Sequence, residues 1–155
     1  MNKVAIALGG NVGKVKDTFN EAILLLMKAG LKDIKISPIL INPAVGCIEG
    51  TPDFENAAIT GNWGKSALEL LEACQRIELT LGRPQEHKSN MSRTIDLDII
   101  LFGNMIIDTK ELKIPHPRAE NRTFVLNPLS KIAPNWEFLN TRKTVKKSLE
   151  QLVNK

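Results

Sequence analysis

Cysteine is scarce in this sequence, with two residues in 155. Cys47 and Cys74 form no CxxC pair and have no histidine at a spacing typical of zinc sites. This argues against a structural zinc site and against a disulfide framework. We therefore interpret both residues as reduced, structural thiols.

Long hydrophobic runs are also missing. Apolar residues make up 43% of the chain, but they recur in short periodic groups, none of which approaches the roughly 20 residues of a membrane-spanning helix. The apolar stretch at the amino terminus is interrupted by Gly9 and Gly10 and is too short for a secretory signal. We expect a protein that has no membrane partner and works in the cytoplasm.

The positive charge is spread along the chain rather than gathered in one patch. A net charge of +4 and a pI near 9.1 suggest nucleic-acid binding as one alternative. The most basic run, residues 142–147, falls on an expected terminal helix, where a solvated face accommodates it. Four arginines instead lie in or beside expected loops, near acidic residues and a histidine, which suits a small anionic ligand and no nucleic-acid partner. They are Arg83, Arg93, Arg118 and Arg122.

The length and the hydrophobic periodicity predict a single α+β domain over residues 1–155, which we expect to be a monomer. Strands and helices are expected in the order βαββαβ. This order is typical of a ferredoxin-like core, an antiparallel sheet with two helices on one face. The expected strands are 3–8, 34–41, 54–63 and 94–102. The expected helices are 15–29, which Gly30 ends, and 66–81, which a capping box of Ser66 and Glu69 begins.

Shorter elements are expected after residue 102, and the pattern gives no sign of an internal repeat or a second core. Residues 42–52 and 83–92 are too rich in glycine and proline, or too polar, to continue a strand or a helix. Loops of this length are often functional. The shorter elements are strands near 105–107 and 112–114, a proline turn at 115–117, a helix near 125–129 and a terminal helix from about 144.

Two acids, Asp96 and Asp98, stand two apart on the strand expected at 94–102. Such side chains share a face of a strand, so both carboxylates project away from the aliphatic face. Two adjacent like charges repel each other unless a cation neutralises them, and Mg²⁺ ions are the simplest such cations. Incidental acids on a solvent-facing strand are the alternative. The aliphatic face is predicted to contain Ile95, Leu97, Ile99 and Leu101, each worth roughly 1.5 to 3 kcal/mol when buried.

Residues 9–14 are rich in glycine and lie between an expected strand and an expected helix. Their spacing matches neither G-x-G-x-x-G nor G-x-x-x-x-G-K-[ST], the phosphate-binding patterns. We interpret the segment as a tight turn, with direct ligand contact as the alternative.

Phe54 and Asn56 share one face of the strand expected at 54–63. A flat heterocycle can stack on the ring of Phe54 and form hydrogen bonds with the amide of Asn56. A core phenylalanine beside a turn-capping asparagine explains the two residues equally well.

Short motifs run in a fixed order across nearly the whole chain. They are LGGN at 8–11, PDFENAA at 52–58, QRIE at 75–78, GR at 82–83, RTIDLDIILFG at 93–103, PHPR at 115–118 and NRTFVL at 121–126. In this order they resemble the 6-hydroxymethyl-7,8-dihydropterin pyrophosphokinase family. The combination of the Arg-x-x-Asp-x-Asp strand with the Pro-His-Pro-Arg turn is highly specific.

The resemblance implies a function in folate biosynthesis. The enzyme would transfer the β,γ-pyrophosphoryl unit of ATP to 6-hydroxymethyl-7,8-dihydropterin, giving the pterin diphosphate and AMP. The implied catalytic residues are Arg83, Arg93, Asp96 and Asp98, and the two aspartates would hold two Mg²⁺ ions. The implied ATP-binding residues are Gln75, Glu78, Arg93, Ile99, His116 and Arg122. The implied pterin-binding residues are Asn42, Pro43, Val45, Phe54, Asn56 and Phe124, with the pterin ring between the two phenylalanines.

The loop at 84–92 departs from the family pattern. Gln85 stands where well-known members have an arginine, Asn90 where they have a tryptophan, and Met91 replaces a small residue. These changes predict weaker closure of the loop over the substrates and slower turnover than in a typical member. They also leave open a second hypothesis, a noncatalytic relative that binds a pterin or a nucleotide.

Overall fold

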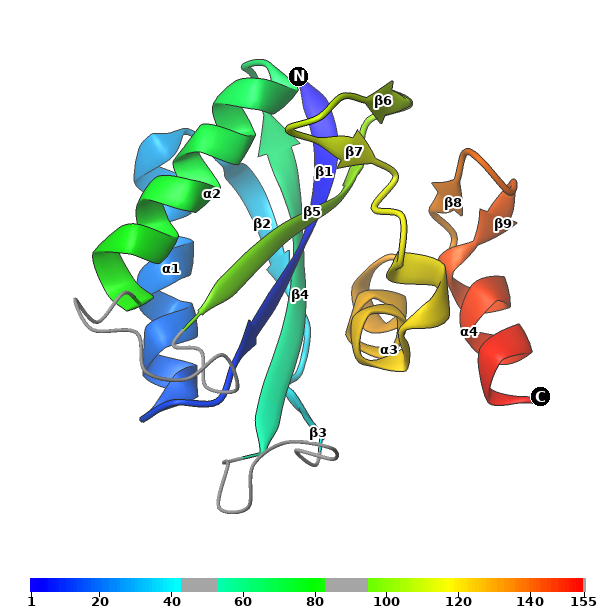
Figure 1. The fold of residues 1–155 in the computed structure, drawn as a ribbon, viewed down its shortest axis with the longest axis horizontal. Helices are drawn as coiled ribbons and strands as arrows, with labels where there is room; N and C mark the ends of the chain where they lie inside the picture. Colours follow the sequence, from blue (N-terminus) through cyan, green and yellow to red (C-terminus); the bar gives the residue numbers. More distant parts are fainter. Residues whose placement is uncertain (43–52, 83–94, 155) are drawn as a thin grey trace.

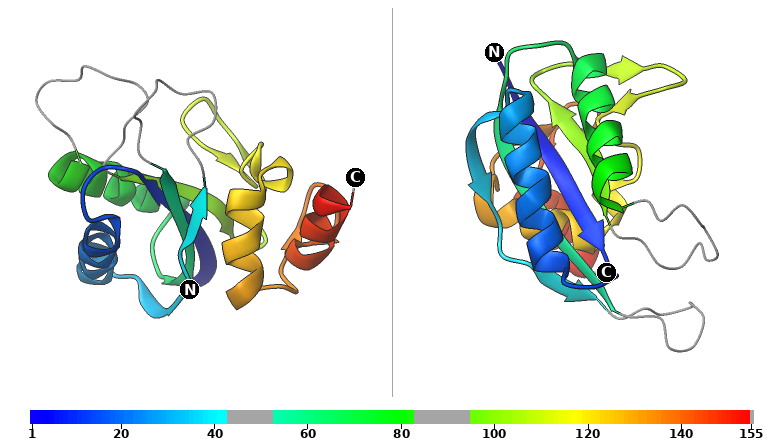
Figure 2. Two further views of the ribbon diagram at one scale, coloured as in Figure 1. Left: turned by 90° about the horizontal axis from the view of Figure 1, so that it is seen from below. Right: turned by 90° about the vertical axis from the view of Figure 1, so that its left-hand side faces the viewer.

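The computed structural model describes residues 1–42, 53–82 and 95–154. An antiparallel five-stranded sheet lies between two layers of helices (Figures 1 and 2). The strand order is β2-β4-β1-β5, with β3 also paired to β4. The strands are β1 (Asn2–Gly10), β2 (Lys32–Ile36), β3 (Leu40–Asn42), β4 (Phe54–Trp63) and β5 (Asp96–Phe102).

Helices α1 (Val15–Ala29) and α2 (Ala67–Gly82) cover one face of the sheet. The sequence marks the ends of both. Gly30 ends α1 with φ 124°, a backbone conformation that favours glycine. The predicted capping box begins α2, because the Glu69 N–H donates to Ser66 Oγ (3.1 Å) and the Ser66 N–H donates to Glu69 Oε1 (3.2 Å). The order of strands and helices and the antiparallel sheet confirm the predicted ferredoxin-like core, with β2 and β3 in place of its single second strand.

The strand predicted at 34–41 is two strands, β2 and β3, which both pair with β4. Pro38 lies between them and has no N–H to donate to a ladder. Ser37 keeps the connection close to β4, since its N–H donates to the Ala58 carbonyl (2.9 Å) and its Oγ accepts from the Ala58 N–H (2.8 Å).

The other face of the sheet carries a second hydrophobic core, so the prediction of a single core is wrong. Small side chains of the sheet, such as Ala5, Ala7 and Ala58, pack there with residues of the outer helices. Alanine is small and only weakly hydrophobic, so the sequence pattern did not indicate that this face of the sheet is buried. The outer layer contains α3 (Thr123–Ile132), α4 (Val145–Val153), the 3-10 helix η1 (Ala119–Asn121) and the hairpin of β8 (Glu137–Phe138) with β9 (Lys143–Thr144). The hairpin of β6 (Ile107–Asp108) with β7 (Lys113–Ile114) instead packs against the first core.

A β-bulge in β5 changes the alternation of side chains. Ile6 of β1 pairs with Ile99, but Ala5 pairs with Leu101, so Ile100 is an extra residue. Leu101 therefore packs in the second core, away from Leu97 and Ile99. The prediction that Leu101 shares their face is wrong, because period two does not continue through a bulge.

Cys74 is buried in α2 and forms no disulfide. Burial, together with the nearby carboxylates of Glu78 and Asp98, raises the pKa of its thiol to about 12. The thiol therefore stays protonated, as expected of a structural cysteine. Cys47 lies outside the described residues. None of the helices in the described ranges has the length and apolar character that a membrane crossing requires.

Candidate active site

A cavity of about 550 Å³ lies between the sheet and the start of α3, and we call it the sheet cavity. Three neighbouring strands form its floor. Gly9 of β1 pairs with Asn56 of β4 on one side and with Asp96 of β5 on the other. Residues directly opposite one another in a sheet project to the same face, so an amide and a carboxylate flank a glycine. The next row contains Ala58, Ala7 and Asp98.

Gly9 and Gly10 belong to β1 and line the sheet cavity, so the turn predicted at 9–14 is wrong for these two residues. A Cβ atom at Gly9 would lie 3.1 Å from Asn56 Oδ1, closer than ordinary van der Waals contact. Because Gly9 has no side chain, the Asn56 amide has room in the cavity. The chain turns after β1, where Gly13 has φ 68°.

Asp96 and Asp98 both line the sheet cavity, as their spacing predicts. Helix α2 holds the strand that carries them. The Leu97 N–H donates to Glu78 Oε2 at 2.8 Å, so the backbone between the two acids is fixed from the outer side of β5. Among the described residues, no group of three or more His, Cys, Asp or Glu side chains is arranged to hold a metal ion. Two carboxylates still suit Mg²⁺, which completes its shell with water and phosphate oxygens.

The start of α3 forms the wall of the sheet cavity that faces the acids. Arg122 occupies the N-cap position of the helix, and Arg122, Phe124 and Val125 line the cavity. The guanidinium carbon of Arg122 lies 5.4 Å from the ring centroid of Phe124. A helix N-terminus carries partial positive charge and free N–H groups. This wall therefore favours an anionic ligand group.

Polar and aromatic side chains meet at the β3–β4 end of the cavity, where Asn42 pairs with Phe54. Asn42, Phe54, Asn56 and Phe124 all line it. The buried Asn42 Nδ2 has no hydrogen-bond acceptor in the described part of the chain. A buried donor of this kind needs an acceptor, and a heterocyclic ligand can supply one.

His116 is fixed at both its backbone and its ring. Its N–H donates to the Ile100 carbonyl (3.0 Å), and its Nδ1 accepts from the Arg118 N–H (3.2 Å). Burial lowers the pKa of the imidazole, and Arg122 and Arg118 lower it further against the opposing effect of Asp98. His116 is therefore neutral near pH 7, with its proton on Nε2, where it can donate a hydrogen bond.

The structure divides the predicted site residues into three groups. Asn42, Phe54, Asn56, Asp96, Asp98, Arg122 and Phe124 line the sheet cavity. Gln75, Glu78, Ile99 and His116 are described but do not belong to its lining. Pro43, Val45, Arg83 and Arg93 lie outside the described residues, as do Gln85, Asn90 and Met91 of the divergent loop.

In the second group, Gln75 and Glu78 belong to α2, Ile99 belongs to β5, and His116 follows β7. Glu78 binds the backbone of β5, and His116 donates to the Ile100 carbonyl. The side chain of Ile99 is buried in the core, so only its backbone is available to a ligand.

Sequence reasoning did not predict several residues of the cavity lining. Gly9 and Gly10 were assigned to a turn, although their place directly after an expected strand indicated that they lie near its end. Ala7 and Val125 are apolar residues whose exposure to a cavity depends on tertiary packing. Leu8 also borders the cavity, but its side chain is buried in the first core on the opposite face of the sheet.

The chain is similar to proteins of one family. A model of the family described as 7,8-dihydro-6-hydroxymethylpterin-pyrophosphokinase matches residues 5–134. The chain is 36% identical over 148 residues to the 2-amino-4-hydroxy-6-hydroxymethyldihydropteridine pyrophosphokinase of Synechocystis sp., covering 95% of this chain and 74% of the relative. It is 40% identical over 139 residues to the protein of the same name from Bacillus subtilis, covering 88% and 82%.

Solved structures show the same fold. A crystal structure of an HPPK-DHPS in complex with substrates matches 99% of this chain with a TM-score of 0.72 at 15% identity. The wild-type HPPK-DHPS of Plasmodium falciparum matches 99% of it with a TM-score of 0.71 at 14% identity. The chain spans 44% of the length of each of these structures.

Proposed function

The chain belongs to the 7,8-dihydro-6-hydroxymethylpterin-pyrophosphokinase family and is a pyrophosphokinase of folate biosynthesis, and we propose that the sheet cavity is where it joins ATP and the pterin. The single observation that carries this proposal is the row Asn56, Gly9 and Asp96. It places an amide suited to a heterocycle and a carboxylate suited to a metal and phosphate on one cavity floor. The product would be the pterin diphosphate, with release of AMP.

The pterin would occupy the β3–β4 end of the cavity. Its ring would stack between Phe54 and Phe124, and its polar edge would bind the amides of Asn42 and Asn56. The buried Asn42 Nδ2, which has no acceptor among the described residues, supports this placement. Pro43 and Val45 would complete the pocket.

Two Mg²⁺ ions would be held by Asp96 and Asp98, with the triphosphate and water completing their coordination. Bound there, they would neutralise the charge that develops on the phosphate oxygens. Arg122 and the N-terminus of α3 provide positive charge on the opposite wall. Arg83 and Arg93 would add two further cations.

The rest of the nucleotide would extend along the outer edge of β5. The Leu97 N–H points to that edge, where it meets Glu78, and by alternation the backbone of Ile99 points the same way. Gln75, Glu78, Ile99 and His116 would then contact the nucleotide. The neutral imidazole of His116 would donate from Nε2 to an oxygen of the nucleotide.

The transfer itself needs positioning and charge neutralisation more than proton abstraction. The hydroxymethyl oxygen of the pterin forms a bond to the β-phosphorus of ATP, and the bond from this phosphorus to the α,β-bridging oxygen breaks. The bridging oxygen leaves on the phosphate of AMP, and the hydroxyl proton passes to water. The residues of the cavity hold the two reacting groups in line and exclude water. No general base is assigned.

An assay of AMP release from ATP and the reduced hydroxymethylpterin, with Mg²⁺ present, tests the proposal. Asp96→Asn should lower the rate at least about 100-fold, as for loss of one charge-stabilising group. Asp108→Asn is the matched control, because Asp108 is an exposed acid that pairs with Lys113 (2.6 Å) outside the cavity, and it should leave the rate unchanged. Pterin binding without AMP release by the unaltered protein would instead support the noncatalytic hypothesis.

The divergent loop gives a second, separate test. We propose that Gln85, Asn90 and Met91 weaken loop closure. A chimera that restores arginine at 85 and tryptophan at 90 should then raise turnover, measured in the same assay. An unchanged rate would count against the role given to this loop.

A further inference from the structure

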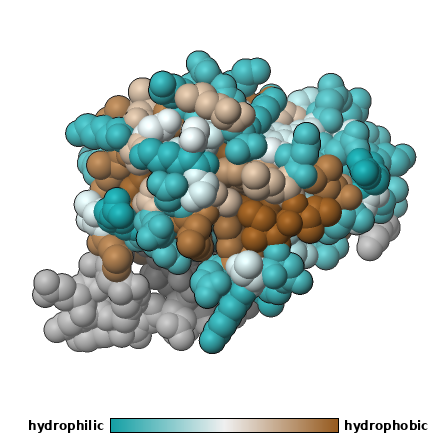
Figure 3. All heavy atoms as spheres, turned by 90° about the horizontal axis from the view of Figure 1, so that it is seen from above, coloured by the Kyte–Doolittle hydropathy of each residue, from teal (hydrophilic) through white to brown (hydrophobic). Residues whose placement is uncertain are grey.

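A second cavity, of about 560 Å³, lies at the opposite end of β1 from the sheet cavity, near the amino terminus. A space-filling view from the side of the amino terminus and β6 shows hydrophilic residues around a hydrophobic stretch (Figure 3). The two cavities share no residue. Lys3 in the second cavity precedes Gly9 by six residues of β1, or about 20 Å of strand. We call this cavity the Trp136 cavity, and its volume is typical of small-molecule sites.

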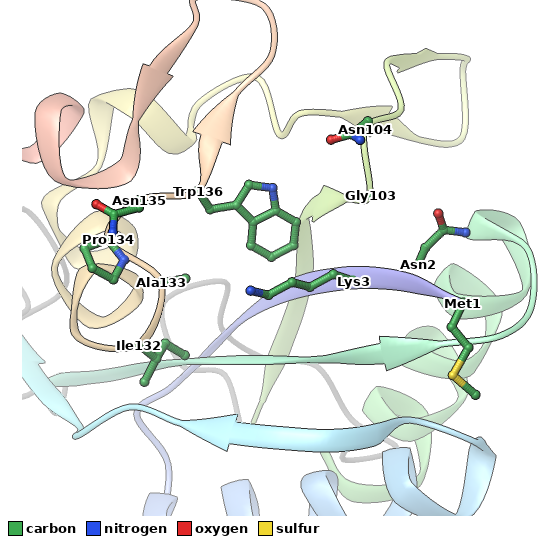
Figure 4. A pocket seen from close by; sticks show the side chains of 10 residues that line it. All are labelled: Met1, Asn2, Lys3, Gly103, Asn104, Ile132, Ala133, Pro134, Asn135 and Trp136. Atoms are coloured by element: carbon green, nitrogen blue, oxygen red, sulfur yellow. The ribbon is translucent and has the colours of Figure 1, made fainter.

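Trp136 presents its indole to this cavity (Figure 4). Lys3 Nζ lies 5.3 Å from the ring centroid, which is a cation–π distance. Trp63 differs from Trp136 in its burial and in the hydrogen bond of its indole. Its ring is buried, and its indole N–H donates to the Ser66 carbonyl (3.0 Å). Trp136 is only half-buried, and its indole N–H has no acceptor within the described residues.

The polar groups of the Trp136 cavity favour an anion. Lys3 is the only charged side chain among the residues that line it. Asn2, Asn104 and Asn135 contribute three neutral amides. Gly103 has φ 53°, and a Cβ there would lie 2.7 Å from Asn2 Oδ1, so the glycine makes room for this amide. The lining contains no acidic side chain, so a negatively charged group in the cavity is attracted by Lys3 and is not repelled by a like charge.

We propose that the Trp136 cavity binds a planar aromatic molecule that carries an anionic group such as a carboxylate. The aromatic ring packs against the indole of Trp136, beside Lys3. The anionic group accepts hydrogen bonds from Lys3 Nζ and from the Trp136 indole N–H. Apolar contacts come from Ile132, Ala133 and Pro134, beside the tryptophan.

Titration of ¹⁵N-labelled protein with 2-naphthoate tests this site directly. The chain has two tryptophans, so the spectrum has two indole N–H signals, and loss of one in Trp136→Leu assigns them. The Trp136 signal should shift with a dissociation constant of about 1 mM or tighter, while the Trp63 signal should stay in place. The neutral amide 2-naphthamide should bind about tenfold more weakly, because it lacks the charge.

Two substitutions distinguish binding in the Trp136 cavity from binding elsewhere on the protein. Lys3→Gln should weaken 2-naphthoate binding about tenfold, whereas Lys65→Gln should not change it. Lys65 is the matched control because it lies 5.4 Å from the ring of Trp63, the other lysine–tryptophan pair. A fixed Trp136 signal, or unchanged affinity in Lys3→Gln, would overturn the proposal. Equal binding of 2-naphthamide would overturn its anionic character.

Discussion

At the scale of single residues, the geometry of the proposed active site depends on a missing side chain as well as on charged ones. Gly9 separates Asn56 from Asp96 in one row of the sheet, and its missing Cβ leaves space for the amide. Asp96, Asp98 and Arg122 bring charged groups of both signs to the same cavity.

Gly9→Ala should therefore impair pterin binding specifically. The new Cβ would push Asn56 Oδ1 from its position, and loss of one hydrogen bond of roughly 1 to 1.5 kcal/mol raises the pterin KM about tenfold. The KM for ATP should change little. Steady-state kinetics check this, with Gly64→Ala as control, since a Cβ there makes an ordinary contact of 3.6 Å. Equal effects of both substitutions would refute the role of Gly9.

His116 should make the ligand-free protein less stable in acid. Its pKa is lowered in the folded state, chiefly by burial. Above the usual pKa of about 6.5, both the folded and the unfolded state hold a neutral imidazole. Below it the unfolded state takes up a proton first, so the free energy of unfolding falls as pH drops towards the folded pKa.

NMR titration measures this pKa directly in a His87→Gln variant, which keeps His116 as the only histidine. Its resonances should titrate below the usual value, and urea unfolding of His116→Asn should show a weaker pH dependence between about pH 5 and 6.5. Titration at or above the usual value would contradict the prediction.

At the scale of elements, local signals define most boundaries and tertiary contacts decide the exceptions. The capping box and the glycine stop of α1 appear in the structure as predicted. Pro38 divides one expected strand, and the bulge at Ile100 moves Leu101 to the other face. The same bulge separates the acidic half of β5 from the half that is buried on both faces.

Ser66→Ala should destabilise α2 without altering the chemistry. The hydroxyl caps the Glu69 N–H at 3.1 Å, and loss of such a cap costs about 1 kcal/mol in the free energy of unfolding. Urea denaturation measures this loss. Ser66→Thr keeps the capping oxygen, so its free energy of unfolding should fall much less. A fall as large as that of Ser66→Ala would argue against the cap as the cause.

At the scale of the whole molecule, the sheet is buried on both faces, by α1 and α2 on one side and by α3 on the other. The sheet cavity exists because the small residues of β1 leave space under the start of α3. We propose that the two cores unfold together as one domain, since β1 and β5 contribute to both.

Phe138→Ala tests this cooperativity. Phe138 is fully buried in the second core, and its truncation should cost about 3 to 5 kcal/mol. Unfolding followed at Trp63, in the first core, and at Trp136, beside the second, should give coincident transitions in the variant and the parent. Single-tryptophan variants separate the two signals. An earlier transition at Trp136 would show that the outer layer unfolds alone.

The sequence by itself determined the features that depend on local chemistry. Strand β4 has the predicted bounds, Phe54–Trp63, and α1 the predicted bounds, Val15–Ala29. The period of two also placed Asp96 and Asp98 together on one face, because no bulge lies between them. Hydrophobic periodicity, caps and turn residues act within a few positions of the chain, so they can be recognised without knowing the fold.

Only the tertiary structure decided the features that depend on pairing between distant segments. These include the bulge at Ile100, the short hairpin of β8 and β9, the second core, and the row of Asn56, Gly9 and Asp96. The three residues of that row come from three strands, and their alignment follows from the register of two ladders. Register depends on how whole faces of a sheet are buried, and no local pattern in a strand specifies its partner.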